Sequence, residues 1–464
     1  MSVQDPTPLR RTADPAGLAA PDRTGPLTWV QRLWLPEAPD RQIASHEDNQ
    51  FRELSLATPL DPGTARRAVR QVLARHEVLR TRVTGLGDDA RQVVDALDPG
   101  YERVLRTVDL DTWDEAVAEA RRTSFRLASQ WPLTLLMGIR AGKVLRVAVV
   151  VDHWASDGLG VLVLHDDLAS ALLAHARGTG WTPAGPVEQP VDLALWESAT
   201  PAGAAHLRRA LAYWRKQCER LSRDLSGHRP DPVPKAPLDG TPLSFPGCTM
   251  TSFRLAEAAS MVADRLRVPV SAVYLAAFSS AIGAAEQAGV VGTLMLSANR
   301  LTAAAMRSVR NAVISAPVAL DLTQPGGFAA TVAAAASQQV QVFRYANADH
   351  RLTGDIAEEV LGDLRDGALT GAVFNFMPEA ALRGDPIPAV MRDAPCDVVE
   401  AMPKRATAAP RMLMVIARQD RVTLTLRWRE DTSWQRWAEP MLRHIADLIT
   451  HEAAPDKPLP AFGG

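Results

Sequence analysis

Apolar residues in the first part of the chain follow helical and strand periods in separate stretches. Between residues 60 and 76 they recur every three or four positions after an acidic residue and a proline, which predicts a helix. Residues 144–151 form an almost unbroken β-branched run, typical of a strand covered on both faces. Residues 162–176 return to the helical period. The local plan is therefore strand, polar turn, helix.

The second half of the chain repeats this mixture of periods. A short strand-like piece at 251–255 is followed by a predicted helix at 256–266, and an Ala-rich helix is predicted at 270–283. Further predicted elements are strands at 290–296, 412–417 and 422–428 and a helix at 433–451. The pattern predicts an α/β protein.

The length of 464 residues predicts two lobes, because single hydrophobic cores stop growing at about 250–300 residues. Pro- and Gly-rich stretches at 178–201 and 227–246 flank an amphipathic segment at 204–221, which suggests connectors around a bridging helix. The expected organisation is a flexible N-terminal tail (1–25), an N-terminal lobe (26–178), a connector with the bridging helix (179–247) and a C-terminal lobe (248–464).

Composition and charge narrow the class of protein. A hydrophobic fraction of 47% with 22% charged residues is that of a globular protein. Lys and Arg number 51 against 53 Asp and Glu, so the formal charge of -2 provides no net basic field to attract phosphates. We therefore expect no nucleic-acid partner.

Cysteine usage and the N-terminus bear on redox chemistry and location. Cys218, Cys248 and Cys396 lie far apart and match neither a disulfide framework nor a zinc-site spacing, so packed thiols and no metal are expected. The first 25 residues lack the apolar centre of a signal peptide, and no membrane-spanning stretch is expected. These features predict a cytoplasmic protein that does not associate with membranes.

The candidate chemistry lies directly after the strand predicted at 144–151. There His153 is followed four positions later by Asp157 and then by Gly158. A strand can fix the backbone, a histidine can exchange a proton in a cleft, and a glycine permits close backbone approach. A histidine at a strand end is more often structural, so this pattern alone is weak. Ser156 lacks the Gly-x-Ser-x-Gly context of an acyl-enzyme serine.

The surrounding segments strengthen the hypothesis. Motif-like stretches occur in order at 26–34, 75–83, 125–133, 291–300, 311–320 and 374–376. Together with residues 152–158, they resemble the condensation-domain superfamily of nonribosomal peptide synthetases, whose signature is His-His-x-x-x-Asp-Gly. The resemblance extends from residue 26 to about residue 448. It implies two chloramphenicol-acetyltransferase-like α/β lobes in a V-shaped pseudo-dimer, with an active-site tunnel between them.

The resemblance also implies roles for individual residues. His153 matches the second signature histidine, which acts as general base or orients the acceptor and stabilises the tetrahedral intermediate. Gly158 matches the signature glycine, whose backbone N–H lies near the reacting carbonyl. Asp157 matches the structural aspartate that forms an ion pair beneath the active site, and Arg300 is the best candidate for its partner.

One signature position departs from the family, because Asp152 replaces the first histidine. Neighbouring side chains in a strand alternate between faces, so Asp152 is expected to point away from the pocket that holds His153. A buried carboxylate needs compensation, so a cation or several N–H donors are expected nearby. We expect a structural role for Asp152 at the active site; the alternative is that its carboxylate contacts His153 and raises the basicity of the imidazole.

The family resemblance implies a stand-alone acyltransferase of natural-product biosynthesis. It would join a thioester-bound acyl or aminoacyl donor to a small amine or alcohol acceptor, as amide or ester. No cofactor need bind permanently, since the donor would arrive on the phosphopantetheine of a separate acyl or peptidyl carrier protein, or on coenzyme A. The alternative is a catalytically degenerate relative that recruits carrier or tailoring proteins, and Asp152 is the feature that favours it.

Overall fold

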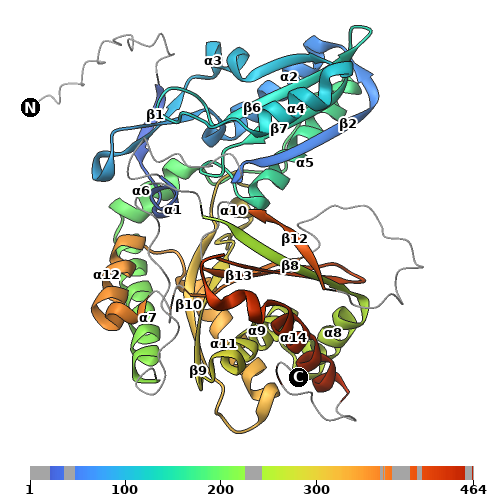
Figure 1. Ribbon diagram of the computed structural model, residues 1–464. Helices are drawn as coiled ribbons and strands as arrows, with labels where there is room; N and C mark the ends of the chain where they lie inside the picture. Colours follow the sequence, from blue (N-terminus) through green and yellow to red (C-terminus); the bar gives the residue numbers. More distant parts are fainter. Residues whose placement is uncertain are drawn as a thin grey trace, which may run out of the picture. The chain divides into compact units, whose positions relative to one another are not determined.

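The structure, a computed structural model, describes residues 21–35, 48–224, 243–365, 369, 371–378, 398–404, 410–454 and 462. The predicted α/β class is confirmed (Figure 1). The chain forms two compact units. Unit 1 comprises Met1–Thr200 with Arg300–Asn311, and unit 2 comprises Pro201–Asn299 with Ala312–Gly464.

Unit 1 contains two sheets. The four-stranded sheet has the order β2 (Gln50–Leu60), β7 (Lys143–Val151), β6 (Leu133–Arg140) and β5 (Leu105–Asp109), with only the β5–β6 pair parallel. An antiparallel sheet joins β1 (Pro21–Pro26), β4 (Arg91–Asp95) and β3 (Thr81–Thr84). The α-helices of unit 1 are α1 (Trp29–Leu33), α2 (Pro62–Arg75), α3 (Leu97–Val104), α4 (Trp113–Arg121), α5 (Gly158–Ala176), α6 (Pro190–Ala199) and α10 (Ala303–Met306).

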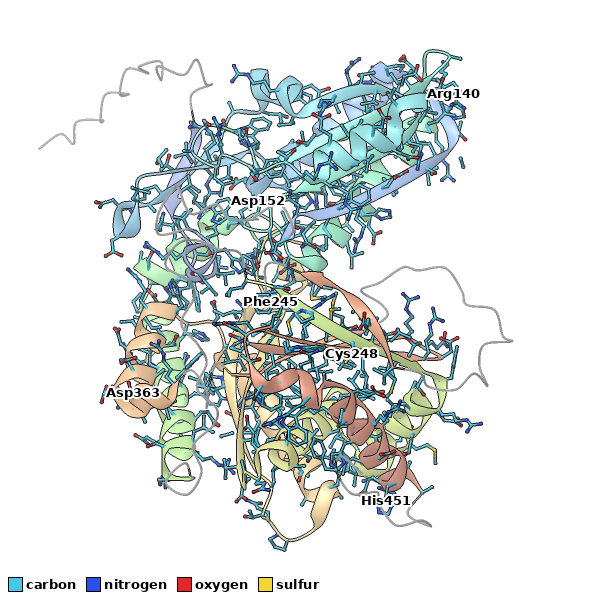
Figure 2. All side chains as sticks on the ribbon, viewed as in Figure 1. Arg140, Asp152, Phe245, Cys248, Asp363 and His451 are labelled. Atoms are coloured by element: carbon cyan, nitrogen blue, oxygen red, sulfur yellow. The ribbon has the colours of Figure 1, made fainter. Side chains whose placement is uncertain are left out.

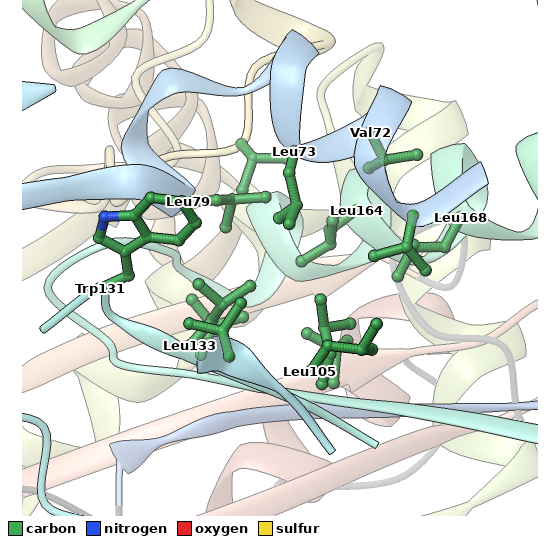
Figure 3. Close-up of a cluster of buried hydrophobic side chains, with 14 of the residues drawn as sticks. Val72, Leu73, Leu79, Leu105, Trp131, Leu133, Leu164 and Leu168 are labelled. Carbon is green, nitrogen blue, oxygen red and sulfur yellow. The ribbon is translucent and has the colours of Figure 1, made fainter. Parts of the chain in front are cut away.

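The predicted central strand is covered on both faces. Alternate residues Val147, Val149 and Val151 of β7 belong to a core cluster to which α2 and α5 contribute Val72, Leu73, Leu164 and Leu168 (Figure 3). The intervening Ala148 and Val150 face a second cluster built around Trp113 of α4. Burial on both faces explains why the β7 sequence is continuously apolar instead of alternating.

Unit 2 contains one seven-stranded sheet. Its order is β10 (Ile314–Asp321), β9 (Val290–Ser297), β11 (Val373–Pro378), β13 (Arg411–Ala417), β14 (Val422–Trp428), β8 (Phe245–Ser252) and β12 (Val398–Lys404). Its α-helices are α7 (Pro201–Asp224), α8 (Phe253–Leu266), α9 (Val270–Glu286), α11 (Gly327–Tyr345), α12 (His350–Leu361) and α14 (Ala438–Ala453). Helices α8, α9, α11 and α14 pack together, whereas α12 packs on α7 (Figure 1).

Two helices begin earlier in the chain than predicted, each because a side chain caps it. Helix α5 begins at Gly158, and the Asp157 side chain accepts a hydrogen bond from Gly160 N. Helix α8 begins at Phe253, and the Ser252 side chain accepts one from Leu255 N. Such side chains satisfy first-turn N–H groups that have no partner within the helix.

The division into units differs from the expected one at a short segment. Arg300–Asn311 belongs to unit 1, although it lies within the second half of the chain. Glu188 anchors this segment in three ways: its N donates to Ala304 O (3.2 Å), its O accepts from Ser308 Oγ (2.6 Å), and its carboxylate pairs with Arg310. The predicted connector is likewise divided, because α6 belongs to unit 1 and α7 to unit 2.

Helix α5 also bears on the expectation that no stretch could span a membrane. By length and composition alone it could, with a mean hydropathy of 1.3, and α8 with α9 would qualify only as a pair bent by 107°. One or two helices of this kind are only a weak indication of a membrane span, because core helices can have the same length and composition. The buried residues of α5, among them Leu164, Leu168 and Leu172, contribute to the core of unit 1.

We expect Gly160→Ala to destabilise the protein. A Cβ at this position would lie 2.8 Å from Arg310 O and 2.7 Å from Ser156 Oγ, so the backbone of the Arg300–Asn311 segment would have to move. Such overpacking typically costs about 1–3 kcal/mol. Thermal or denaturant unfolding would measure the loss. The control is Gly354→Ala in α12, where nothing lies within 4 Å and a small gain in stability is expected. Equal unfolding midpoints for the two variants would contradict this packing.

Candidate active site

The turn between β7 and α5 is organised by Asp152, which is the first residue after the strand (Figure 2). Its N donates to Pro132 O (2.9 Å), and its O accepts from Ala155 N (3.0 Å) and Ser156 N (3.2 Å). Its Oδ1 accepts from Trp154 N (2.8 Å), the local side-chain turn that aspartate favours. The turn begins at Asp152, so strand alternation does not determine whether its side chain points away from His153.

The Asp152 carboxylate is buried with little compensation. Only 9% of the residue is exposed, and among the described residues no cation pairs with it. The expected cation is thus missing from this part of the chain, and the Trp154 N–H is the one donor recorded for the carboxylate there. Burial raises the pKa of Asp152 from 3.8 to about 6; the hydrogen bond from Trp154 opposes the rise, and nearby Asp48 adds to it. Ionisation at this site is costly.

Asp157 and Arg300 form a buried ion pair. Arg300 Nη1 donates to Asp157 Oδ2 (2.8 Å) and Nη2 donates to Oδ1 (2.9 Å), so the contact is bidentate. The same carboxylate caps α5, and Arg300 Nη2 also donates to Arg310 O (2.8 Å). The pairing expected from the sequence is present, with the Asp157 side chain fully buried.

A second buried charge cluster lies beside this pair, and the sequence did not single it out. Arg310 contacts Glu188 at 2.5 Å. Burial lowers the pKa of Arg310, while Glu188, Asp157 and Glu197 act against that shift. Glu197 in turn accepts from Trp29 N (2.8 Å). No helical or strand periodicity in the sequence marks these residues as buried. A charged residue among apolar neighbours was the one sequence feature that could have predicted the cluster.

His153 lies in the turn, half-buried, between an amide and an indole. Asn311 Nδ2 lies 3.1 Å from His153 Nδ1 and donates to His153 O at 2.8 Å. The Trp34 ring stacks on the imidazole with centroids 4.1 Å apart and planes within 8°. Asn311 and Trp34 were part of the motif-like stretches but were not predicted as site residues. Gly158 follows as the first residue of α5.

His76, Cys218 and Cys248 are buried in the structure. His76 Nε2 lies 2.8 Å from Asp167 Oδ2, and burial lowers the pKa of His76 despite this partner. Cys218 and Cys248 are buried free thiols, the latter on β8 (Figure 2), and Cys396 lies outside the described residues. Within the described ranges, no group of three or more His, Cys, Asp or Glu side chains is placed to hold a metal ion.

The fold and this site define the class of protein. The condensation-domain family model matches residues 22–378, well over half of the chain. The chain therefore belongs to the condensation-domain family, in which condensation domains generally catalyse amide or ester bond formation.

Individual relatives support the same assignment. The probable non-canonical nonribosomal peptide synthetase CymA of Salinispora arenicola is 33% identical over 225 residues, which is 45% of this chain and 3% of CymA. The chain thus spans only a small part of that relative's length. The condensation domain that mediates chain release from the enacyloxin polyketide synthase has a TM-score of 0.69 at 17% identity, covering 97% of this chain and 86% of that one.

A third similarity concerns a complex. The X-domain solved together with OxyB from teicoplanin biosynthesis has a TM-score of 0.65 at 18% identity, and 95% of each chain is covered. At these identities the two structural likenesses establish the fold alone.

We predict that Asp157→Ala and Arg300→Ala each destabilise the protein by about 3–5 kcal/mol, because each change leaves one buried charge without its partner. In the double variant no charge is stranded, so its loss should be no greater than that of either single variant. Unfolding midpoints of the three variants test this. Additive losses would show that the two side chains stabilise the protein independently.

Asp152→Asn should stabilise the protein at neutral pH. The folded state holds the Asp152 proton more tightly than the unfolded chain, so stability is lost as the pH rises from about 4 past 6. A pKa difference of this size corresponds to at most about 3 kcal/mol. Asparagine keeps an acceptor for Trp154 N and removes the charge. Thermal midpoints should differ most at pH 7–8 and converge near pH 4.

The control for this pH dependence is Asp95→Asn. Asp95 is also buried but accepts two hydrogen bonds from Arg82, at 2.7 and 2.8 Å. Neutralising it should lower the midpoint at pH 7. If Asp152→Asn also lowered the midpoint at pH 7, the carboxylate would have a stabilising partner, and the raised pKa would be wrong.

Proposed function

We propose that this chain is a condensation-type acyltransferase that acts on thioester donors, with His153 at its active centre. The observation that best supports this proposal is the arrangement around His153. Asn311 and Trp34 hold its imidazole, and the Asp157–Arg300 pair anchors the turn in which it lies. A half-buried imidazole fixed on a rigid element is the kind of group that acyl transfer requires.

The proposed reaction is direct transfer without a covalent enzyme intermediate. The acceptor nitrogen or oxygen attacks the thioester carbonyl carbon, a tetrahedral intermediate forms, and the C–S bond breaks as the carbonyl is restored. The acceptor proton leaves with the thiol. His153 acts on this centre, and the N–H of Gly158 at the start of α5 is a second candidate to contact the developing oxyanion.

The proposal includes the donor and the setting. The donor is an acyl or aminoacyl group on the phosphopantetheine of a carrier protein or on coenzyme A. The acceptor is a small amine or alcohol. No permanently bound cofactor is required, and the reaction belongs to natural-product biosynthesis in the cytoplasm.

The second candidate is recruitment of a carrier or tailoring protein without catalysis. Two observations favour it: the aspartate in place of the first signature histidine, and the likeness to an X-domain that was solved with OxyB. The Asx-type turn made by Asp152 weighs against decay, because it supplies a hydrogen bond that holds His153's own turn together.

We expect His153→Ala to lower the rate of acyl transfer by about a hundredfold or more with little change in stability. Loss of a general base costs roughly 10²–10⁴-fold and loss of one oxyanion donor about 10²–10³-fold. The assay follows product formation from carrier-bound and coenzyme A thioesters by mass spectrometry. The control is His175→Ala at the end of α5, where the ring contacts Gln71.

Near-normal transfer by His153→Ala would remove this residue from the mechanism. If the parent transfers no acyl group from any thioester, but binds a carrier protein equally well with and without His153, recruitment replaces catalysis as the function.

A further inference from the structure

The contact between Asn311 and His153 fixes the direction of a hydrogen bond. The Asn311 side chain reaches two atoms of the same residue: His153 O at 2.8 Å and His153 Nδ1 at 3.1 Å, both from Nδ2. A carbonyl oxygen can only accept, so the amide group facing it must be the NH₂. The reversed amide would set two oxygens against each other at 2.8 Å.

The same NH₂ group lies 3.1 Å from His153 Nδ1, within hydrogen-bond distance. Nδ1 must then present its lone pair, since two N–H groups cannot bond to each other. In a neutral imidazole one nitrogen carries the proton and the other accepts, so the proton lies on Nε2. Protonating Nδ1 would sacrifice the Asn311 hydrogen bond.

Both partners are held in place by the surrounding structure. Asn311 is buried and directly follows Arg310, whose carbonyl accepts from Arg300 and from Asp157 N. The imidazole plane is fixed by the stacked Trp34 ring. Turning the ring over would place a carbon at the amide and lose the hydrogen bond, so this geometry defines one ring orientation.

We propose that Asn311 is a positioning residue that keeps His153 in the Nε2–H tautomer, so that His153 meets the reactants as a hydrogen-bond donor. Its consequence for catalysis rests on the proposed acyl-transfer function. A donor at Nε2 stabilises the oxyanion of the tetrahedral intermediate, but it has no lone pair there with which to deprotonate an acceptor.

This tautomer selects an amine acceptor. A neutral amine attacks with its own lone pair: the N–C bond forms, the C–S bond breaks, and the ammonium proton passes through solvent to the departing thiolate. An alcohol must lose its proton during attack, which the Nε2–H tautomer does not support. We therefore infer amide formation rather than ester formation.

The tautomer is tested without any assay of activity. Nitrogen-15 NMR of protein labelled at its ten histidines distinguishes Nε2–H from Nδ1–H imidazole, and His153→Gln assigns the resonances. The parent should show neutral His153 as Nε2–H. Asn311→Asp should convert it to Nδ1–H, because the carboxylate can only accept: it loses the contact with His153 O, which offers no hydrogen, and accepts from Nδ1 instead. An Nδ1–H parent, or an unchanged tautomer in the variant, overturns the proposal. The parent spectrum stands even if the variant fails to fold.

The matched control is Asn49→Asp. Asn49 Nδ2 also donates to two backbone carbonyls, those of Arg121 and Thr123, and within the described ranges no histidine bonds to it. Asn49→Asp should leave the His153 resonances unchanged. If Asn49→Asp changed these resonances as much as Asn311→Asp does, the change would not depend on the Asn311 contact, and the proposal would be overturned.

The acceptor class is tested with a matched amine and alcohol. Because amines are better nucleophiles in solution, the diagnostic quantity is the amine-to-alcohol ratio of kcat/KM in Asn311→Asp relative to the parent. It should fall by about tenfold or more, as Nε2 gains a lone pair. An unchanged ratio, or a parent that prefers the alcohol, overturns the acceptor inference. Absence of transfer to either acceptor would refute the proposed function, whereas the NMR result would still decide the tautomer.

Discussion

The buried ion pair between Asp157 and Arg300 is the interaction on which the site depends. Removing two charges from water is expensive, and the cost is offset only where geometry and further hydrogen bonds are good. Here the contact is bidentate, the carboxylate also caps α5, and the guanidinium also binds Arg310 O. The pair therefore joins three pieces of backbone: the turn, the start of the helix and the segment that carries Asn311.

Much of this could be predicted from the sequence, for physical reasons that differ between residues. The strand β7 was predictable because burial on both of its faces requires a continuous run of apolar residues. The Asp157–Arg300 pairing came from the family resemblance. The contacts of His153 with Asn311 and Trp34 could not be predicted, because they join segments far apart in the chain, 158 residues in the case of Asn311, and no period relates such positions. Strand alternation does not decide the orientation of Asp152, because the strand ends one residue earlier, at Val151.

Asp152 illustrates a conflict between shape and charge. As a short acceptor, it closes the turn with a hydrogen bond from Trp154 N, which a turn of this kind needs. As a carboxylate, it is placed where burial opposes ionisation. The geometric benefit and the electrostatic penalty come from the same side chain, so the residue can be structurally appropriate and still reduce the stability of the protein at neutral pH.

The membership of Arg300–Asn311 in unit 1 has a consequence for how the protein is made. Asp157 emerges from the ribosome 143 residues before its partner, a delay of about 7–30 s at usual rates of synthesis. During that interval the first unit lacks both Arg300 and Val309, which belongs to its core. Its folding is thus completed by a segment translated within the second unit, which couples the maturation of the two halves.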